Sequence, residues 1–95
     1  MIAVSVRKGE IEISGHSNYA ESGKDIVCAG VTALTQTLIR SLENLTSDEI
    51  EYEISPGRAD IHCRNLTDEG KLLVDSFFIG ICLIADEFPD HVRIE

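Results

Sequence analysis

The stretch IVCAGVTALTQTLIRSLENL, residues 26–45, decides the fold of this chain. Its apolar side chains recur at steps of three to four residues, which is the period of a helix with one apolar stripe. The stripe consists of Val27, Val31, Leu34, Leu38, Leu42 and Leu45. Asp25, directly before the stretch, is a good N-cap because its carboxylate can accept hydrogen bonds from first-turn amides. We therefore expect a helix from Ile26 to about Leu45.

Alternating apolar and polar residues predict two β-hairpins, one on each side of this helix. The first hairpin joins residues 2–6 to residues 11–13, and the second joins residues 50–54 to residues 59–63. The Pro-Gly pair at 56–57 fits the central positions of a type II turn, so it separates the second pair of strands.

A second helix is expected from about Glu69 to about Glu87, with Thr67 or Asp68 as its N-cap. Its segment 77–85 is apolar on nearly every side, so the helix must bury more than one face. We expect one face to cover the sheet, and a second subunit is the candidate partner for another.

Val92 and Ile94 predict a short final strand. The resulting order, ββαββαβ with strands joined by hairpins, is typical of an α+β fold. We expect two layers, a mainly antiparallel sheet with both helices on one face. Because chains of 95 residues rarely form two cores, residues 1–95 are expected to be a single domain.

The charge balance is strongly acidic. Seventeen acidic residues against eight basic ones give a formal net charge of −9. Such a chain is unsuited to neutralising phosphates, so no direct nucleic-acid partner is expected. The same field attracts a cationic protein or peptide, which makes a basic protein the expected partner.

Neither a membrane segment nor a metal site is predicted. The longest apolar run, 77–85, is far shorter than the roughly twenty residues that span a bilayer, and the first residues lack a secretory signal pattern. Cys28, Cys63 and Cys82 are widely spaced and odd in number, which fits neither a disulfide framework nor a zinc knuckle. We expect a cytoplasmic protein without a metal or cofactor, and no membrane partner.

A long loop, residues 15–25, connects the strand that ends at Ser14 to the first helix. Strand-to-helix loops usually have about two to six residues, and longer ones often carry function. With Asp25 as N-cap, Cys28 falls at the third helical position, where unpaired amides favour a thiolate. A helix terminus stabilises a thiolate by only about 0.3 to 1 kcal/mol, so Cys28 also needs a basic partner to react as a thiolate. His16 is the candidate for this partner.

Cys28 and His16 thus form a candidate pair of nucleophile and general base. Asp25 could orient the imidazole, and first-turn amides could stabilise an oxyanion. The alternative is that Cys28 fills the core, since free cysteines are among the most buried residues, and that Asp25 is only a cap.

Other site templates fit less well. No arginine follows Cys28 as a phosphatase loop requires, and residues 15–23 have no phosphate-binding glycine pattern. The remaining cysteines and histidines lack metal-ligand spacing. We expect the cysteines to be structural and the histidines to be solvated: Cys63, Cys82, His62 and His91.

The residues GHSNYAESGKDIVCAGVTAL, 15–34, resemble the signature of the bacterial ribosomal-processing cysteine protease family, called Prp. Gly-His at the loop start and Gly-x-Asp-Ile-Val-Cys-Ala at the helix start carry the match. The resemblance implies a homodimeric endopeptidase that removes a short N-terminal extension, ending in aromatic residues, from the large-subunit ribosomal protein numbered twenty-seven. It implies Cys28 as nucleophile and His16 as base, with Asp25 and Thr32 in support.

Further loop residues are candidates for binding the substrate. Tyr19 and Ile26 could line a pocket for its apolar side chains. Gly15 and Gly23, one at each end of the loop, could let it close as a lid over the substrate tail. Ser17 stands where the resembled family often has alanine, which affects loop detail and not the chemistry.

Two other functions stay open at this stage. One is a non-catalytic acidic module that binds a basic ribosomal or assembly protein, with Cys28 buried. The other is a thiol redox sensor, although no resolving cysteine lies near Cys28 in the sequence.

Overall fold

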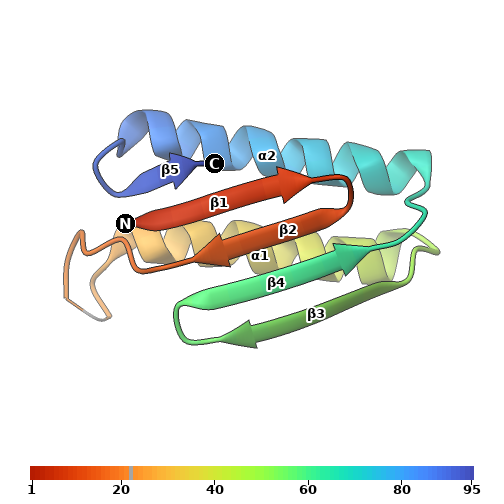
Figure 1. Ribbon diagram of the computed structural model, residues 1–95, viewed down its shortest axis with the longest axis horizontal. Helices are drawn as coiled ribbons and strands as arrows, with labels where there is room; N and C mark the ends of the chain where they lie inside the picture. Colours follow the sequence, from red (N-terminus) through yellow and green to blue (C-terminus); the bar gives the residue numbers. More distant parts are fainter. Residues whose placement is uncertain (22) are drawn as a thin grey trace.

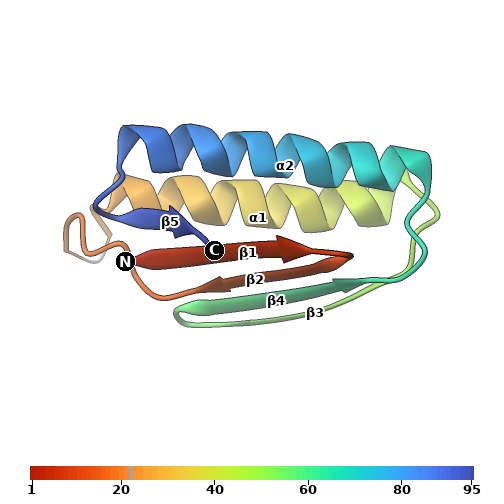
Figure 2. The same cartoon turned by 45° about the horizontal axis from the view of Figure 1, so that its top comes forward.

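In residues 1–21 and 23–95, which the computed structural model describes, five strands form one sheet and two helices lie on one of its faces (Figure 1, Figure 2). The strands are β1 (Ile2–Arg7), β2 (Glu10–Ser14), β3 (Ile50–Ser55), β4 (Arg58–Cys63) and β5 (Val92–Ile94). The helices are α1 (Ile26–Leu45) and α2 (Asp68–Glu87). The predicted α+β class and ββαββαβ order are confirmed, and α2 begins one residue earlier than expected, after Thr67 as N-cap.

Each helix is a crossover between two strands that run in the same direction. The strands are ordered β3-β4-β2-β1-β5, and both predicted hairpins are present. Antiparallel pairing of β2 with β4 joins the hairpins, whereas β5 runs parallel to β1, with Val92 opposite Ile2. A parallel return of this kind needs a long connection, which α2 supplies. The sheet is therefore mainly antiparallel, as predicted.

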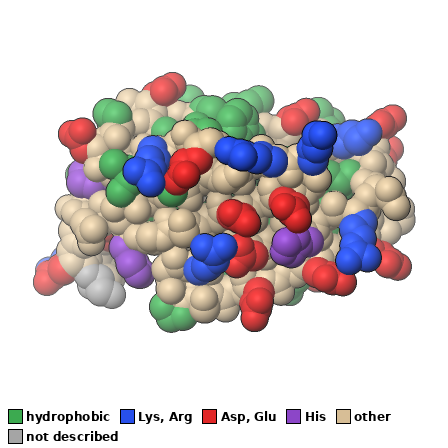
Figure 3. Space-filling view, in the orientation of Figure 1, with side chains coloured by type: hydrophobic (Ala, Val, Ile, Leu, Met, Phe, Trp, Pro, Cys, Tyr) green, Lys and Arg blue, Asp and Glu red, His purple; other side chains and the backbone are tan. Residues whose placement is uncertain are grey.

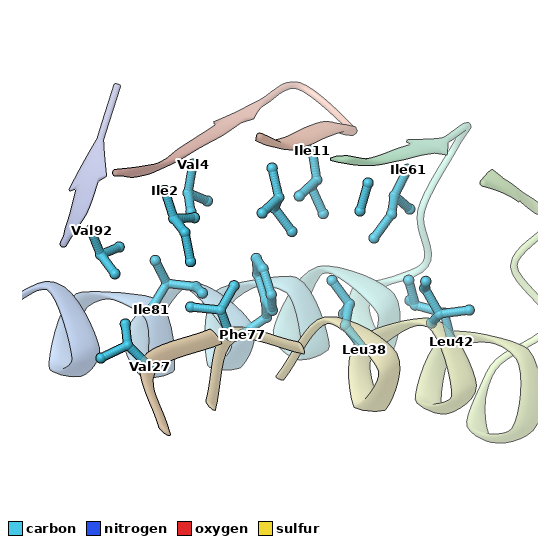
Figure 4. Packing of buried hydrophobic residues seen from close by; sticks show 14 residues of the cluster. Ile2, Val4, Ile11, Val27, Leu38, Leu42, Ile61, Phe77, Ile81 and Val92 are labelled. Carbon is cyan, nitrogen blue, oxygen red and sulfur yellow. The ribbon is translucent and has the colours of Figure 1, made fainter. Parts of the chain in front are cut away.

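The core lies between the sheet and the helices. Figure 4 shows Val4 and Ile61 pointing from the sheet toward Leu42 of α1 and Ile81 of α2. All four are fully buried. Because alternate residues of a strand point to opposite faces, the alternation that predicts the strands also selects the core positions. Each such burial contributes about 1.5–3 kcal/mol.

The face of the sheet that carries no helix is polar. Figure 3 shows side chains of both charges spread over this face. Glu12 lies opposite Asp60 across β2 and β4, and the Arg58 guanidinium is 2.9 Å from the Asp60 carboxylate. His62 is exposed, with Nδ1 3.4 Å from the Glu10 carboxylate. The prediction that His62 is solvated is therefore confirmed.

Helix α2 keeps apolar side chains on two sides. Phe77 and Ile81 are buried in the core, whereas Leu72, Ile79 and Leu83 are 70%, 63% and 66% exposed. The predicted helix with more than one apolar face is thus present. Within the described residues, no helix combines the length and apolar character needed to cross a membrane.

The two cysteines outside α1 are both partly buried. Cys63 is half-buried against the core, and this burial raises the pKa of its thiol. Cys82 of α2 is also half-buried, and both thiols are free. Over the part of the chain that the structure describes, no cluster of histidines, cysteines and acids could hold a metal ion.

Candidate active site

Cys28 lies in the first turn of α1, at the end of the long loop. The Asp25 carboxylate caps this helix, and its Oδ1 accepts a hydrogen bond from the Cys28 amide at 2.9 Å. The predicted N-cap and the placement of Cys28 at the third helical position are confirmed. The Cys28 side chain is half-buried, which places its sulfur at the surface of the core and not inside it.

The Asp25 carboxylate is held by the loop and not by the imidazole. Burial alone raises the pKa of Asp25, but four hydrogen bonds outweigh it and keep the pKa well below its ordinary value. The donors are the Ser17 hydroxyl and the amides of Cys28, Ala20 and Tyr19. Among the described residues, His16 is not one of its partners. The suggestion that Asp25 orients the imidazole is therefore not supported by this geometry.

Ser17 occupies a position that its sequence context did not reveal. Its side chain is only 1% exposed, and its hydroxyl donates to Asp25 Oδ2 while lying 3.2 Å from Cys28 Sγ. The serine thus bridges the cap and the thiol, which is more than a detail of the loop. In the sequence, only the presence of a hydroxyl directly after His16 could have indicated this bridging position.

His16 rests on the turn between β3 and β4. A Cβ atom built on Gly57 would lie 2.7 Å from His16 Nε2, so only glycine leaves room for the imidazole there. Gly57 has φ +73°, as expected in the type II turn, and its carbonyl accepts from the Gly15 amide at 2.8 Å. The turn predicted only as a connection is therefore the support of His16.

Two hollows meet at the candidate pair. His16, Cys28 and Thr32 line both of them, so the structure brings these three predicted residues together. The inner hollow, about 210 Å³, has mainly apolar walls: Ile2, Ile13, Val31, Ile54 and Ala59, with Gly15 at its rim. The outer hollow, about 910 Å³, is bordered by the loop and by the exposed side of α1: Asn18, Gly23, Lys24, Ile26, Ala29 and Ala33.

The first half of the loop is fixed by the segment that precedes β5. His91 Nδ1 lies 2.8 Å from the Ser17 carbonyl oxygen, and since a carbonyl only accepts, Nδ1 carries the proton. The Tyr19 ring packs edge-on against both Phe88 and His91, with centroids 5.3 Å apart in each case. One prediction is therefore wrong, because His91 is half-buried rather than solvated. Tyr19 packs against this segment and lines neither hollow, and its role in binding the substrate stays a prediction.

The arrangement suits nucleophilic attack on a carbonyl group. A thiol at a helix N-terminus and an imidazole border the same two hollows, and both hollows have mainly apolar walls. An extended peptide could cross from one hollow to the other past the sulfur. These are the elements of acyl transfer through a thioester.

The comparison with protein families agrees with this chemistry. A family model described as "Cysteine protease Prp" matches residues 1–93. The chain belongs to the Prp family of cysteine proteases. The resemblance seen in residues 15–34 thus extends over nearly the whole chain.

Named relatives in the Prp family come from several bacteria. The ribosomal processing cysteine protease Prp of Bacillus subtilis is 26% identical over 110 residues, covering 99% of this chain and 96% of that protein. The protein of that name from Staphylococcus aureus is 25% identical over 88 residues, covering 90% and 83%.

Solved structures show the same Prp fold. A structure of the Staphylococcus aureus protease with a covalently linked product peptide superposes with a TM-score of 0.90 at 23% identity, covering 99% of this chain and 95% of that one. A Streptococcus mutans protein reaches a TM-score of 0.79 at 29% identity, covering 99% and 90%. The two-layer architecture is therefore shared across these relatives.

Proposed function

We propose that this chain is a cysteine endopeptidase that removes a short N-terminal extension from the large-subunit ribosomal protein numbered twenty-seven, in the cytoplasm, and that residues 1–95 act as one catalytic domain. The observation that carries the proposal is the meeting of Cys28 and His16 at the junction of two hollows. Membership of the Prp family and the ribosomal processing activity in its relatives' names support it.

In the proposed reaction, His16 takes the thiol proton of Cys28, and the thiolate attacks the carbonyl carbon of the scissile peptide bond. First-turn amides of α1 ahead of Cys28 stabilise the oxyanion, because the Cys28 amide itself is bound by Asp25. The C–N bond breaks as the imidazolium protonates the leaving amine. Water then attacks the thioester, with His16 as base, and the proton returns to the sulfur.

The inner hollow is the proposed site for an apolar side chain next to the scissile bond. Its walls Ile13, Val31 and Ile54 suit an aromatic or aliphatic group, and Thr32 at its border could contact the peptide backbone. The formal charge of −9 would draw a basic ribosomal protein toward the site. Gly15 and Gly23, with φ +96° and +87°, are the proposed ends of a loop that closes over the bound tail.

Incubation of wild-type protein with a peptide of the extended N-terminus should give one cut directly after its aromatic residues, detected by mass spectrometry. A matched peptide with alanine in place of the aromatic residues should be cut at least about tenfold more slowly, because losing a large apolar group from a pocket costs more than 1.4 kcal/mol. Equal cleavage of both peptides would contradict the assignment of the inner hollow. No cleavage of either would contradict the proposed substrate.

We also propose a homodimer that packs through the outer side of α2, because Leu72, Ile79 and Leu83 expose large apolar side chains there. Sedimentation equilibrium should give twice the chain mass of 10.5 kDa for wild type and the monomer mass for Ile79→Glu. Leu45→Glu, at a 70% exposed apolar position of α1, is the control and should remain dimeric. A monomeric wild type would contradict the dimer.

A further inference from the structure

The Ser17 hydroxyl lies between a carboxylate and the sulfur of Cys28. It donates to Asp25 Oδ2 and is 3.2 Å from Cys28 Sγ. Its side chain is 1% exposed, so water does not compete for these contacts. Hydrogen bonds thus connect the carboxylate of the helix cap to the hydroxyl and the hydroxyl to the thiol.

Which group donates and which accepts in these hydrogen bonds follows from counting protons. A serine hydroxyl has one proton, and an ionised carboxylate can only accept. The lowered pKa of Asp25 keeps that carboxylate ionised, so it takes the proton of Ser17. Lone pairs of the hydroxyl oxygen then face the sulfur. They can accept a hydrogen bond from a thiol, but they repel a thiolate.

Ser17 is fixed from two further directions. Its carbonyl accepts from His91 Nδ1, and its hydroxyl is also 3.4 Å from the Tyr19 amide. Because Ser17 directly follows His16, the two cannot move independently. The hydroxyl therefore remains in contact with the Cys28 sulfur as long as the loop keeps this conformation.

We propose that Ser17 is a positioning residue that accepts a hydrogen bond from the resting Cys28 thiol and holds the sulfur protonated until His16 removes its proton. The inference rests on the proposed role of Cys28 as nucleophile. It assigns Ser17 a restraining effect, since the serine opposes thiolate formation in the resting loop. The charged and titratable side chains that border the same hollows as Cys28 are His16, Lys24, Asp25 and Arg58.

The first test is the pH dependence of Cys28 alkylation by iodoacetamide, followed by mass spectrometry. Ser17→Ala should move the midpoint of the rate profile to lower pH by about half to one unit, a roughly three- to tenfold higher rate on the acid side, because one hydrogen bond to the thiol is lost. The control is Thr35→Val, which removes another buried hydroxyl, bonded to the Val31 carbonyl at 2.8 Å. It should leave the midpoint unchanged. An unchanged or higher midpoint in Ser17→Ala would overturn the proposal.

A second measurement needs no change at Ser17, in case that variant does not fold. The infrared difference between wild type and Cys28→Ala isolates the S–H stretching band of Cys28 from those of Cys63 and Cys82. We expect this band at a lower frequency than that of a free thiol, because the S–H group donates to oxygen. A band at the free-thiol frequency would contradict the proposed hydrogen bond.

Neither measurement uses peptide cleavage, so the outcomes separate the two proposals. A shifted alkylation midpoint in a protein that cuts no peptide would sink the proposed function and keep the role of Ser17. If the protein cuts its peptide and the midpoint stays fixed, the function stands and the role of Ser17 is wrong. In an active protein, the acid limb of the profile of kcat/KM against pH should move with the alkylation midpoint in Ser17→Ala.

Discussion

Replacing Cys28 by alanine is expected to abolish peptide cleavage, with a loss of at least about 10⁴-fold in kcat/KM, because Cys28 is the only thiol among the described residues that line the two hollows. The fold should survive. The hydrogen bond that caps α1 uses the amide of residue 28, and the side chain is only half-buried. Cleavage of the N-terminal peptide by both proteins, read by mass spectrometry, measures the effect.

The chain provides matched controls for this substitution. Cys63→Ala and Cys82→Ala each remove a half-buried free thiol elsewhere in the fold and should keep activity within a fewfold of wild type. Peptide binding by Cys28→Ala, measured by calorimetry, should persist. If wild type and Cys28→Ala bind the peptide equally and neither cuts it, the protein is the acidic binding module considered above.

The elements of the fold were predictable from the sequence because each depends on residues close together in the chain. The apolar stripe from Val27 to Leu45 and the alternation within each strand are local patterns, and Thr67 caps its helix three residues ahead of the amide it binds. The order of the strands is different. Pairing of β1 with β5 joins Ile2 to Val92, and no local pattern specifies such a contact.

The same distinction separates the predicted from the unpredicted parts of the site. The contact between Asp25 and Cys28 spans three residues, which is the ordinary spacing of an N-cap. The contacts of Ser17 with Cys28 and with His91 span 11 and 74 residues. The histidine that holds the loop therefore looks like any solvated residue near the end of the chain, and only the fold places it beside Ser17.

The proposed base gives the second large effect. His16→Ala should lower kcat/KM by about 10²–10⁴-fold, which is the usual contribution of a general acid–base group. The alkylation rate of Cys28 at neutral pH should fall as well, because the imidazole no longer accepts the thiol proton. His62→Ala, at an exposed position on the opposite face of the sheet, is the control and should cut at the wild-type rate. Equal activity of the two variants would show that another group serves as base.

The contact between His16 and Gly57 can be tested by substituting Gly57. In Gly57→Ala the added methyl group would lie 2.7 Å from the imidazole nitrogen, so the ring must shift, and a misplacement of this size can cost about 10²-fold in kcat/KM. Part of any loss could instead come from backbone strain at φ +73°. The double variant separates these causes, because without the imidazole the methyl group displaces no catalytic group. Adding Gly57→Ala to His16→Ala should therefore cost almost no further activity, whereas a full second loss would mean that Gly57 acts through the turn and not through His16.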